Sequence, residues 1–155
     1  MVVVSDTSPL HYLILIDSAE ILAKLFGSLL ITEGVFQELQ NANTPSKVRD
    51  WLNPLPHWIS VQQPLHTLRI PHLHLGESEA ISLALELSAN LLIIDERIGR
   101  KAANQLQLRT TGTLGVLNLA ASQKLISLST AISALQTTSF RADPRLIAEL
   151  LRSTP

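Results

Sequence analysis

The sequence predicts an α/β fold with a central, mostly parallel sheet of about four to five strands and helices on both faces. Short runs rich in Val, Ile and Leu are typical of strands buried on both faces. These runs alternate with segments of helical apolar spacing, and that alternation indicates parallel crossovers. Apolar residues make up 46% of the 155 residues and charged residues 16%, so we expect a folded core rather than a disordered chain.

The first half of the chain alternates between strands and helices. The expected elements are a strand over residues 1–5, helical spacing over 10–26 with a break at 17–18, a strand over 29–32, a helix around 35–39 and a helix over 45–51. Thr44 precedes the last of these and is a candidate N-cap.

The second half continues the pattern after an irregular segment, residues 62–75, that is rich in Pro and His. The expected elements are strands over 58–61, 91–94 and 108–110, and helices over 76–89, 97–106, 112–121, 128–135 and 143–152. The chain shows no linker or repeat. We therefore predict a single domain over residues 1–155, of which 140–155 form a C-terminal helical extension.

Composition restricts location and chemistry. Cysteine is absent, which excludes disulfides and thiolate metal sites. With no long apolar segment and no basic N-terminal region, we expect a cytoplasmic protein with no membrane contact. The formal net charge is −1, so any binding of nucleic acid would need a local basic patch or metal ions.

Two acids follow apolar runs directly. Asp6 ends the run at residues 1–5, and Asp95 ends the run at 91–94. In open parallel sheets, ligands bind beyond the carboxyl ends of the strands, so these carboxylates would lie together if the two strands are neighbours. The alternative is that each Asp only caps the segment that follows it.

Two glutamates are further candidates. Glu77 begins the buried stripe of the helix over 76–89, where an unpaired carboxylate is costly, whereas Glu79 lies on the side expected to face solvent. The alternative for both is a favourable interaction with the positive end of the helix. Glu38 lies at the margin of its helix and by itself would be interpreted as a surface residue.

Five segments together resemble one family. They are Val-Val-Val-Ser-Asp6-Thr-Ser-Pro-Leu, Val35-Phe-Gln-Glu38-Leu, Leu75-Gly-Glu77-Ser-Glu79-Ala-Ile, Leu91-Leu-Ile-Ile-Asp95-Glu-Arg97 and Thr111-Gly-Thr113-Leu-Gly. In this order they are similar to the acidic motifs of PIN-domain proteins, in particular a prokaryotic branch of toxin-like ribonucleases. The chain departs from the pattern before Val35, where relatives commonly carry a Pro.

The resemblance implies the three-layer PIN fold and a metal-dependent endoribonuclease that hydrolyses RNA phosphodiesters. Its catalytic acids would be Asp6, Glu38, Glu77 and Asp95. Of these, Asp6, Glu77 and Asp95 would bind Mg²⁺ or Mn²⁺, hard ions that prefer oxygen ligands. The separation of Glu77 from Asp95 matches the family spacing, which favours Glu77 over Glu79 as the third acid.

The resemblance also implies supporting groups and partners. Thr7, Ser8 and Thr113 are expected to orient water or phosphate by hydrogen bonds. The expected partners are an RNA substrate, a cognate antitoxin (if the chain is the toxin of a toxin–antitoxin pair) and a second copy of the chain in a homodimer.

A basic group follows the fourth acid. Arg97, Arg100 and Lys101 have the spacing of one helix face and are candidates for contacts to RNA phosphates, although a merely solvated face has the same pattern. The histidines of the irregular segment, among them His74, lack the spacing of a zinc site.

Two other functions fit parts of the pattern. A PIN fold can serve as a non-catalytic module that binds nucleic acid or joins an assembly. A phosphotransfer protein would also carry an Asp after a strand. The dehalogenase pattern requires a second Asp where Ser8 stands, and the acidic pair and Lys of a receiver domain are not visible.

Overall fold

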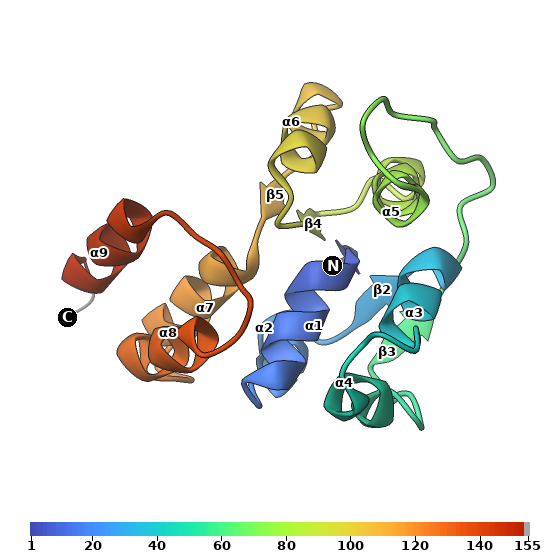
Figure 1. Ribbon diagram of the computed structural model, residues 1–155. Coiled ribbons are helices and arrows are strands. Elements are labelled where there is room, and N and C mark those ends of the chain that lie inside the picture. Colours follow the sequence, from blue (N-terminus) through green and yellow to red (C-terminus); the bar gives the residue numbers. More distant parts are fainter. Residues whose placement is uncertain (154–155) are drawn as a thin grey trace.

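The computed structural model of the chain describes residues 1–153 and has an α/β architecture (Figure 1). Within these residues five strands form one sheet, in which every pair is parallel and the order is β3-β2-β1-β4-β5. The strands are β1 (Val3–Ser5), β2 (Leu29–Ile31), β3 (Ile59–Val61), β4 (Leu91–Ile93) and β5 (Thr110–Thr111). The predicted fold class is confirmed, and the sheet is parallel throughout.

The helices follow the predicted order, and the expected break separates α1 from α2. The helices are α1 (Thr7–Leu15), α2 (Glu20–Phe26), α3 (Glu33–Leu39), α4 (Ser46–Trp51), α5 (Leu75–Glu86), α6 (Arg97–Gln105), α7 (Thr113–Ser122), α8 (Leu128–Gln136) and α9 (Pro144–Arg152). Residues 154 and 155 of the predicted C-terminal extension lie outside the described residues.

Alternating side chains of the strands divide the core into two layers. Val3 and Ile93 pack with α1, α2 and α7 on one face of the sheet, whereas Val4 and Leu92 pack with α5 and α6 on the other. All four side chains are buried. The strands are therefore apolar on both faces, as the continuous apolar runs indicate.

The order of the strands creates a switch point between β1 and β4. From β1 the chain proceeds to β2 and β3 on one side of the sheet, and β4 and β5 lie on the other side (Figure 1). Ser5 is in register with Ile93, and the Asp6 N–H donates to the Ile93 carbonyl at 2.8 Å. The ends of β1 and β4 therefore meet where parallel sheets usually bind ligands.

Three local expectations were wrong. Thr44 does not cap α4: the N-cap is Pro45, and the Thr44 hydroxyl donates to the Glu38 carbonyl at 2.9 Å. The last strand, β5, begins at Thr110 rather than at residue 108. The side of α5 that carries Glu79 was expected to face solvent but is exposed only at Glu86: Ser82 is buried, and its hydroxyl accepts from the Leu68 N–H at 2.8 Å. The irregular segment thus packs over that face.

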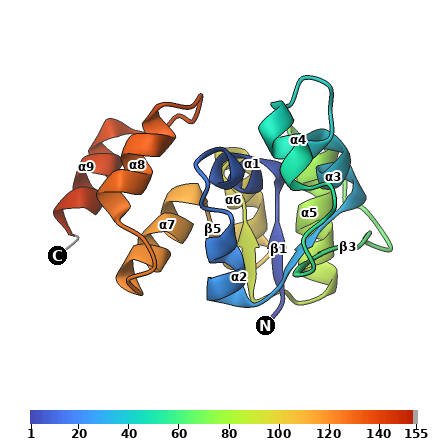
Figure 2. The same cartoon turned by 90° about the horizontal axis from the view of Figure 1, so that it is seen from below.

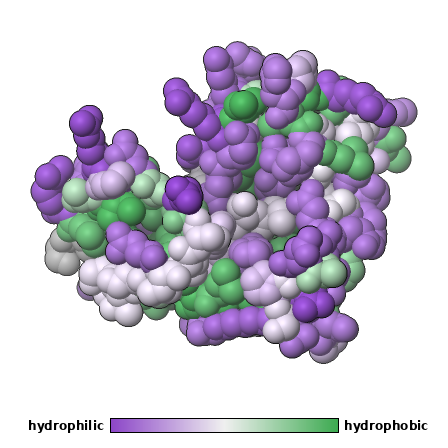
Figure 3. Space-filling view, viewed as in Figure 1, coloured by the Kyte–Doolittle hydropathy of each residue, from purple (hydrophilic) through white to green (hydrophobic). Residues whose placement is uncertain are grey.

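The C-terminal helices lie to one side of the sheet, beyond α7 (Figures 1 and 2). The segment before α9 is held on α1 by contacts from Tyr12: its hydroxyl lies 2.9 Å from that of Ser139, and its ring packs edge-on against Phe140. On α9, Leu146 and Leu151 are exposed, and Figure 3 shows apolar surface over these helices. Among the described residues, no helix has the length and apolar character needed to cross a membrane.

Candidate active site at the sheet switch point

Asp6 is the most deeply buried of the candidate acids. It is the N-cap residue of α1, its side chain is 4% exposed, and its Oδ1 has no hydrogen-bond partner within residues 1–153. Burial raises the pKa of Asp6 to about 7, and the Glu77 and Glu38 carboxylates add to this rise, against the lowering effect of the Thr7 N–H and His74. Burying an unpaired carboxylate costs free energy, so a positively charged group bound at this oxygen would be stabilising.

Glu77 lies beside Asp6 at the start of α5 and is also buried. Its Oε1 lies 2.6 Å from Nε2 of His74, the N-cap residue of the same helix. Burial raises the pKa of Glu77, His74 opposes that rise, and Glu96 and Glu38 add to it. Asp6 and Glu77 therefore share one acidic environment.

Glu38 reaches this environment from α3, which packs against α5. The Thr7 hydroxyl donates a short hydrogen bond to Glu38 Oε2, and Nδ1 of His74 lies 3.5 Å from Oε1. Gly76 permits the approach, because a Cβ at that position would overlap the Glu38 carboxylate. The segment that contains Glu38 thus contacts the segment of Asp6 through Thr7, and it contacts the segment of Glu77 at Gly76.

Asp95 follows β4 and is fixed by α7. The Thr113 N–H and hydroxyl donate to its two carboxylate oxygens, each at 2.7 Å. Burial raises the pKa of Asp95, while the Thr113 hydrogen bonds and the Arg100 charge lower it. The hydroxyls of Thr7 and Thr113 therefore orient carboxylates in this structure. Ser8 lies in the first turn of α1.

The four acids lie around the switch point between β1 and β4, but their carboxylates do not converge on one point. The charges that shift the pKa of Asp6 include Glu38 and Glu77, whereas Asp95 responds to Thr113 and Arg100. Among residues 1–153, no three acidic or histidine side chains are arranged to hold a metal ion as they stand. A shared cation would therefore require side chains to rotate toward it.

Glu79 has a different environment from Glu77. It is buried, and its Oε2 accepts from the Gly34 N–H in the first turn of α3 at 3.0 Å. A Cβ at residue 34 would overlap the Glu79 carboxylate, as the one at residue 76 would overlap Glu38. Glu79 thus joins α5 to α3.

This difference predicts separate effects for the two glutamates. We expect Glu79→Ala to lower the free energy of unfolding by about 1–3 kcal/mol, because it leaves the Gly34 N–H without an acceptor. Metal affinity should change little. Urea denaturation and metal titration of Glu79→Ala and Glu77→Gln would check this, and loss of metal binding in Glu79→Ala would contradict it.

The basic residues after Asp95 lie together on α6. Arg97, Arg100 and Lys101 line a hollow of about 630 Å³ with polar residues of α6 and β5. Arg100 also lies close enough to Asp95 to lower its pKa. Arg100 is therefore shared between the lining of this hollow and the surroundings of Asp95.

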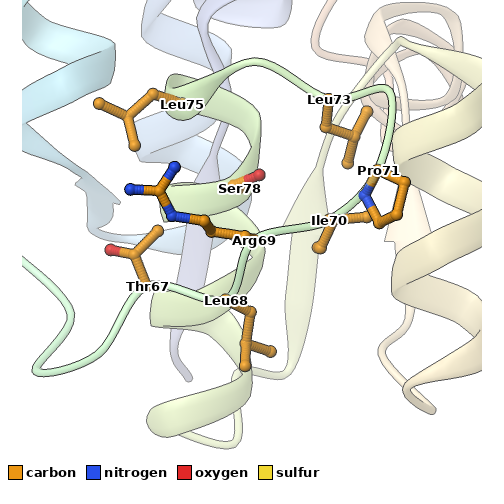
Figure 4. A pocket seen from close by; sticks show the side chains of 8 residues that line it. All are labelled: Thr67, Leu68, Arg69, Ile70, Pro71, Leu73, Leu75 and Ser78. Carbon is orange, nitrogen blue, oxygen red and sulfur yellow. The ribbon is translucent and has the colours of Figure 1, made fainter.

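A second hollow, of about 450 Å³, lies between the irregular segment and the start of α5 (Figure 4). Arg69 is the charged residue of its lining, and Figure 4 shows its side chain between Thr67 and Leu75. Within residues 1–153, no acid lines either this hollow or the one along α6, so both are distinct from the candidate active site.

Known families and solved structures include proteins similar to this chain. A family model described as a PIN domain matches residues 2–154. The chain belongs to the PIN-domain family. This family is of a nuclease type and generally uses divalent metals. The fold of this PIN domain also resembles that of a PilT N-terminus domain protein from the hyperthermophilic archaeon Sulfolobus solfataricus P2. The TM-score is 0.55 at 19% identity, over 92% of this chain and 100% of the other. A search of curated proteins gave no match.

His74 is the site residue that sequence reasoning missed. The sequence predicts an irregular connection for its segment, and the spacing of the histidines there does not match a zinc site. The available signal was its position three residues before Glu77 at the start of a helix, where the side chains of the N-cap and N3 residues lie on the same side of the first turn.

Proposed function

We propose that this PIN domain is a divalent-metal-dependent endoribonuclease that hydrolyses RNA phosphodiesters. The observation that carries the proposal is the buried Oδ1 of Asp6, which has no hydrogen-bond partner among residues 1–153 and lies near two further carboxylates from separate motifs. Asp6, Glu77 and Asp95 are the proposed metal ligands, and Glu38 is the fourth catalytic acid. The cation is Mg²⁺ or Mn²⁺.

The donor set fits such an ion. The four candidate groups are carboxylates, and hard divalent cations prefer oxygen ligands. Two of these carboxylates, Asp6 and Glu77, are buried with a raised pKa, so a cation would remove the cost of ionising them at neutral pH. A zinc site of thiolates is excluded by the absence of cysteine.

The cation and the residues around it would have separate roles in hydrolysis. A bound divalent cation supplies an activated water and stabilises negative charge on the phosphate. Thr113 holds both oxygens of Asp95, and Thr7 holds one oxygen of Glu38. Glu38 is 36% exposed, so its carboxylate is open to solvent and can orient a water for attack in line with the departing oxygen.

An RNA cleavage assay tests the proposal. Wild-type protein is expected to cut a single-stranded RNA pool with Mn²⁺ or Mg²⁺ and not with EDTA. Asp6→Asn should lower the rate by at least about 100-fold, because even groups that only support a metal ligand are worth 10–100-fold. Glu20→Gln, at an exposed acid of α2, is the matched control.

The same assay separates the alternative. If the wild type binds RNA but cuts none of the pool with either cation, the chain is a non-catalytic PIN-fold module. Equal rates for the wild type and Asp6→Asn would also contradict the proposed site.

The hollow on α6 is the proposed path for RNA phosphates. We expect the double variant Arg97→Gln, Lys101→Gln to flatten the dependence of RNA affinity on salt, by about 0.7 in the log–log slope for each phosphate that the protein no longer neutralises. Fluorescence anisotropy at increasing salt would measure this. Lys24→Gln, on the exposed side of α2, should leave the slope unchanged. An unchanged slope in the double variant would place the RNA elsewhere.

The biological role stays a prediction. A cognate antitoxin, a homodimer and a cytoplasmic location are expected from the resemblance and the composition. Light scattering of the purified chain would measure its oligomeric state, and co-expression with the product of a neighbouring reading frame would test for an antitoxin.

A further inference from the structure

His74 is built into the candidate active site by the fold. It is the N-cap residue of α5, with backbone angles of −80° and 172°, so its position is fixed relative to Glu77 in the first turn. Its imidazole lies between carboxylates from two helices, with Nε2 2.6 Å from Glu77 and Nδ1 3.5 Å from Glu38. Its charge also acts on the buried Asp6 carboxylate.

The distance to Glu77 resembles that between two ligands of one ion. Neighbouring donors on an octahedral Mg²⁺ with bonds of 2.0–2.1 Å are about 2.9 Å apart, and on the larger Mn²⁺ they are further apart. Nε2 of His74 and Oε1 of Glu77 form a close ion pair in this structure, so a modest separation of the two atoms and loss of the proton between them would let both bind the same cation. The His74 side chain is 64% exposed, which leaves it free to turn, whereas Asp6 and Glu77 are enclosed.

We propose that His74 is a nitrogen ligand of the active-site cation and makes the site prefer Mn²⁺ to Mg²⁺. The inference rests on the proposed metal dependence and adds a residue outside the four acids. An imidazole favours first-row transition ions, whereas Mg²⁺ is satisfied by carboxylates and water. Carboxylates alone would leave less discrimination between the two cations.

Electron paramagnetic resonance of bound Mn²⁺ tests this without an activity assay. We expect the pulsed spectrum of the wild type at pH 8 to show ¹⁴N modulation from a directly bound nitrogen. His74→Asn should abolish that modulation and lower the ratio of Mn²⁺ to Mg²⁺ affinity about tenfold, the lower end of the effects seen when a metal's support is removed. Asn is a favourable N-cap, so α5 should be retained, and circular dichroism checks this.

His66→Gln provides the matched control, since it replaces an exposed histidine of the same irregular segment. It should leave both the modulation and the affinity ratio unchanged. Binding of Mn²⁺ with no ¹⁴N modulation would overturn the role of His74 and leave the proposed function intact. If Mn²⁺ does not bind at all, both the inference and the proposed metal dependence fail.

Discussion

At pH 8 and without divalent cations, Asp6→Asn is expected to be more stable than the wild type by about 4 kcal/mol. This difference follows from the pKa of Asp6, which rises from 3.8 to about 7 on folding, at about 1.4 kcal/mol for each pH unit. Below pH 4 the carboxyl group is protonated in both states and adds no penalty. Between pH 4 and 7 the unfolded chain loses this proton first, so the stability of the wild type falls as pH rises.

Asparagine removes this dependence because it stays neutral. Its amide nitrogen can also donate to the acids around it, where Oδ1 of Asp6 has no partner within residues 1–153. Urea denaturation in EDTA at pH 5 and pH 8 measures the effect: the two proteins should differ by about 1.7 kcal/mol at pH 5 and by about 4 kcal/mol at pH 8. A less stable Asp6→Asn at pH 8 would mean that the Asp6 carboxylate is satisfied by the fold alone.

A divalent cation should stabilise the wild type more than Asp6→Asn. Binding to the folded wild type at 100 times its dissociation constant adds about 2.7 kcal/mol to its stability, and Asp6→Asn should gain far less. Asp6 would then lower the stability of the metal-free protein and would also be the reason that a divalent cation stabilises it. Equal stabilisation of both proteins by Mn²⁺ would remove Asp6 from the metal site.

Sequence alone was sufficient for the parts of the site that depend on strand ends. Asp6 and Asp95 follow apolar runs, and parallel strands bring such positions to one edge of the sheet. That β1 and β4 are neighbours does not follow from the runs themselves. It depends on the order in which the strands join the sheet.

The rest of the site depends on contacts between distant segments. Glu38 was placed by family resemblance, because its approach to the site depends on the packing of α3 against α5. Glu79 was expected to face solvent, since helical spacing does not reveal that α3 covers it through Gly34. For His74 the sequence offered its place before Glu77 at the start of a helix, but its contact with Glu38 forms only when α3 and α5 are packed together.

Gly76→Ala should lower activity on the order of 100-fold while leaving the fold intact. A Cβ at residue 76 would overlap the Glu38 carboxylate, which is the mobile end of a long side chain and can therefore move aside. The displacement would take Glu38 away from the Thr7 hydroxyl that holds it. Displacements of about 1 Å in a catalytic group can cost 10²-fold in rate.

Gly34→Ala is the matched variant, because its Cβ would displace Glu79 by the same kind of overlap. There the expected loss is in stability, since the Glu79 carboxylate would lose its hydrogen bond from the Gly34 N–H. Alanine favours a helix over glycine by up to about 1 kcal/mol, so any loss of stability in Gly76→Ala should be small. Cleavage rates and urea denaturation of both variants would measure this contrast. If Gly76→Ala retained full activity, the position of Glu38 would not matter for cleavage, and the second acidic motif would be structural.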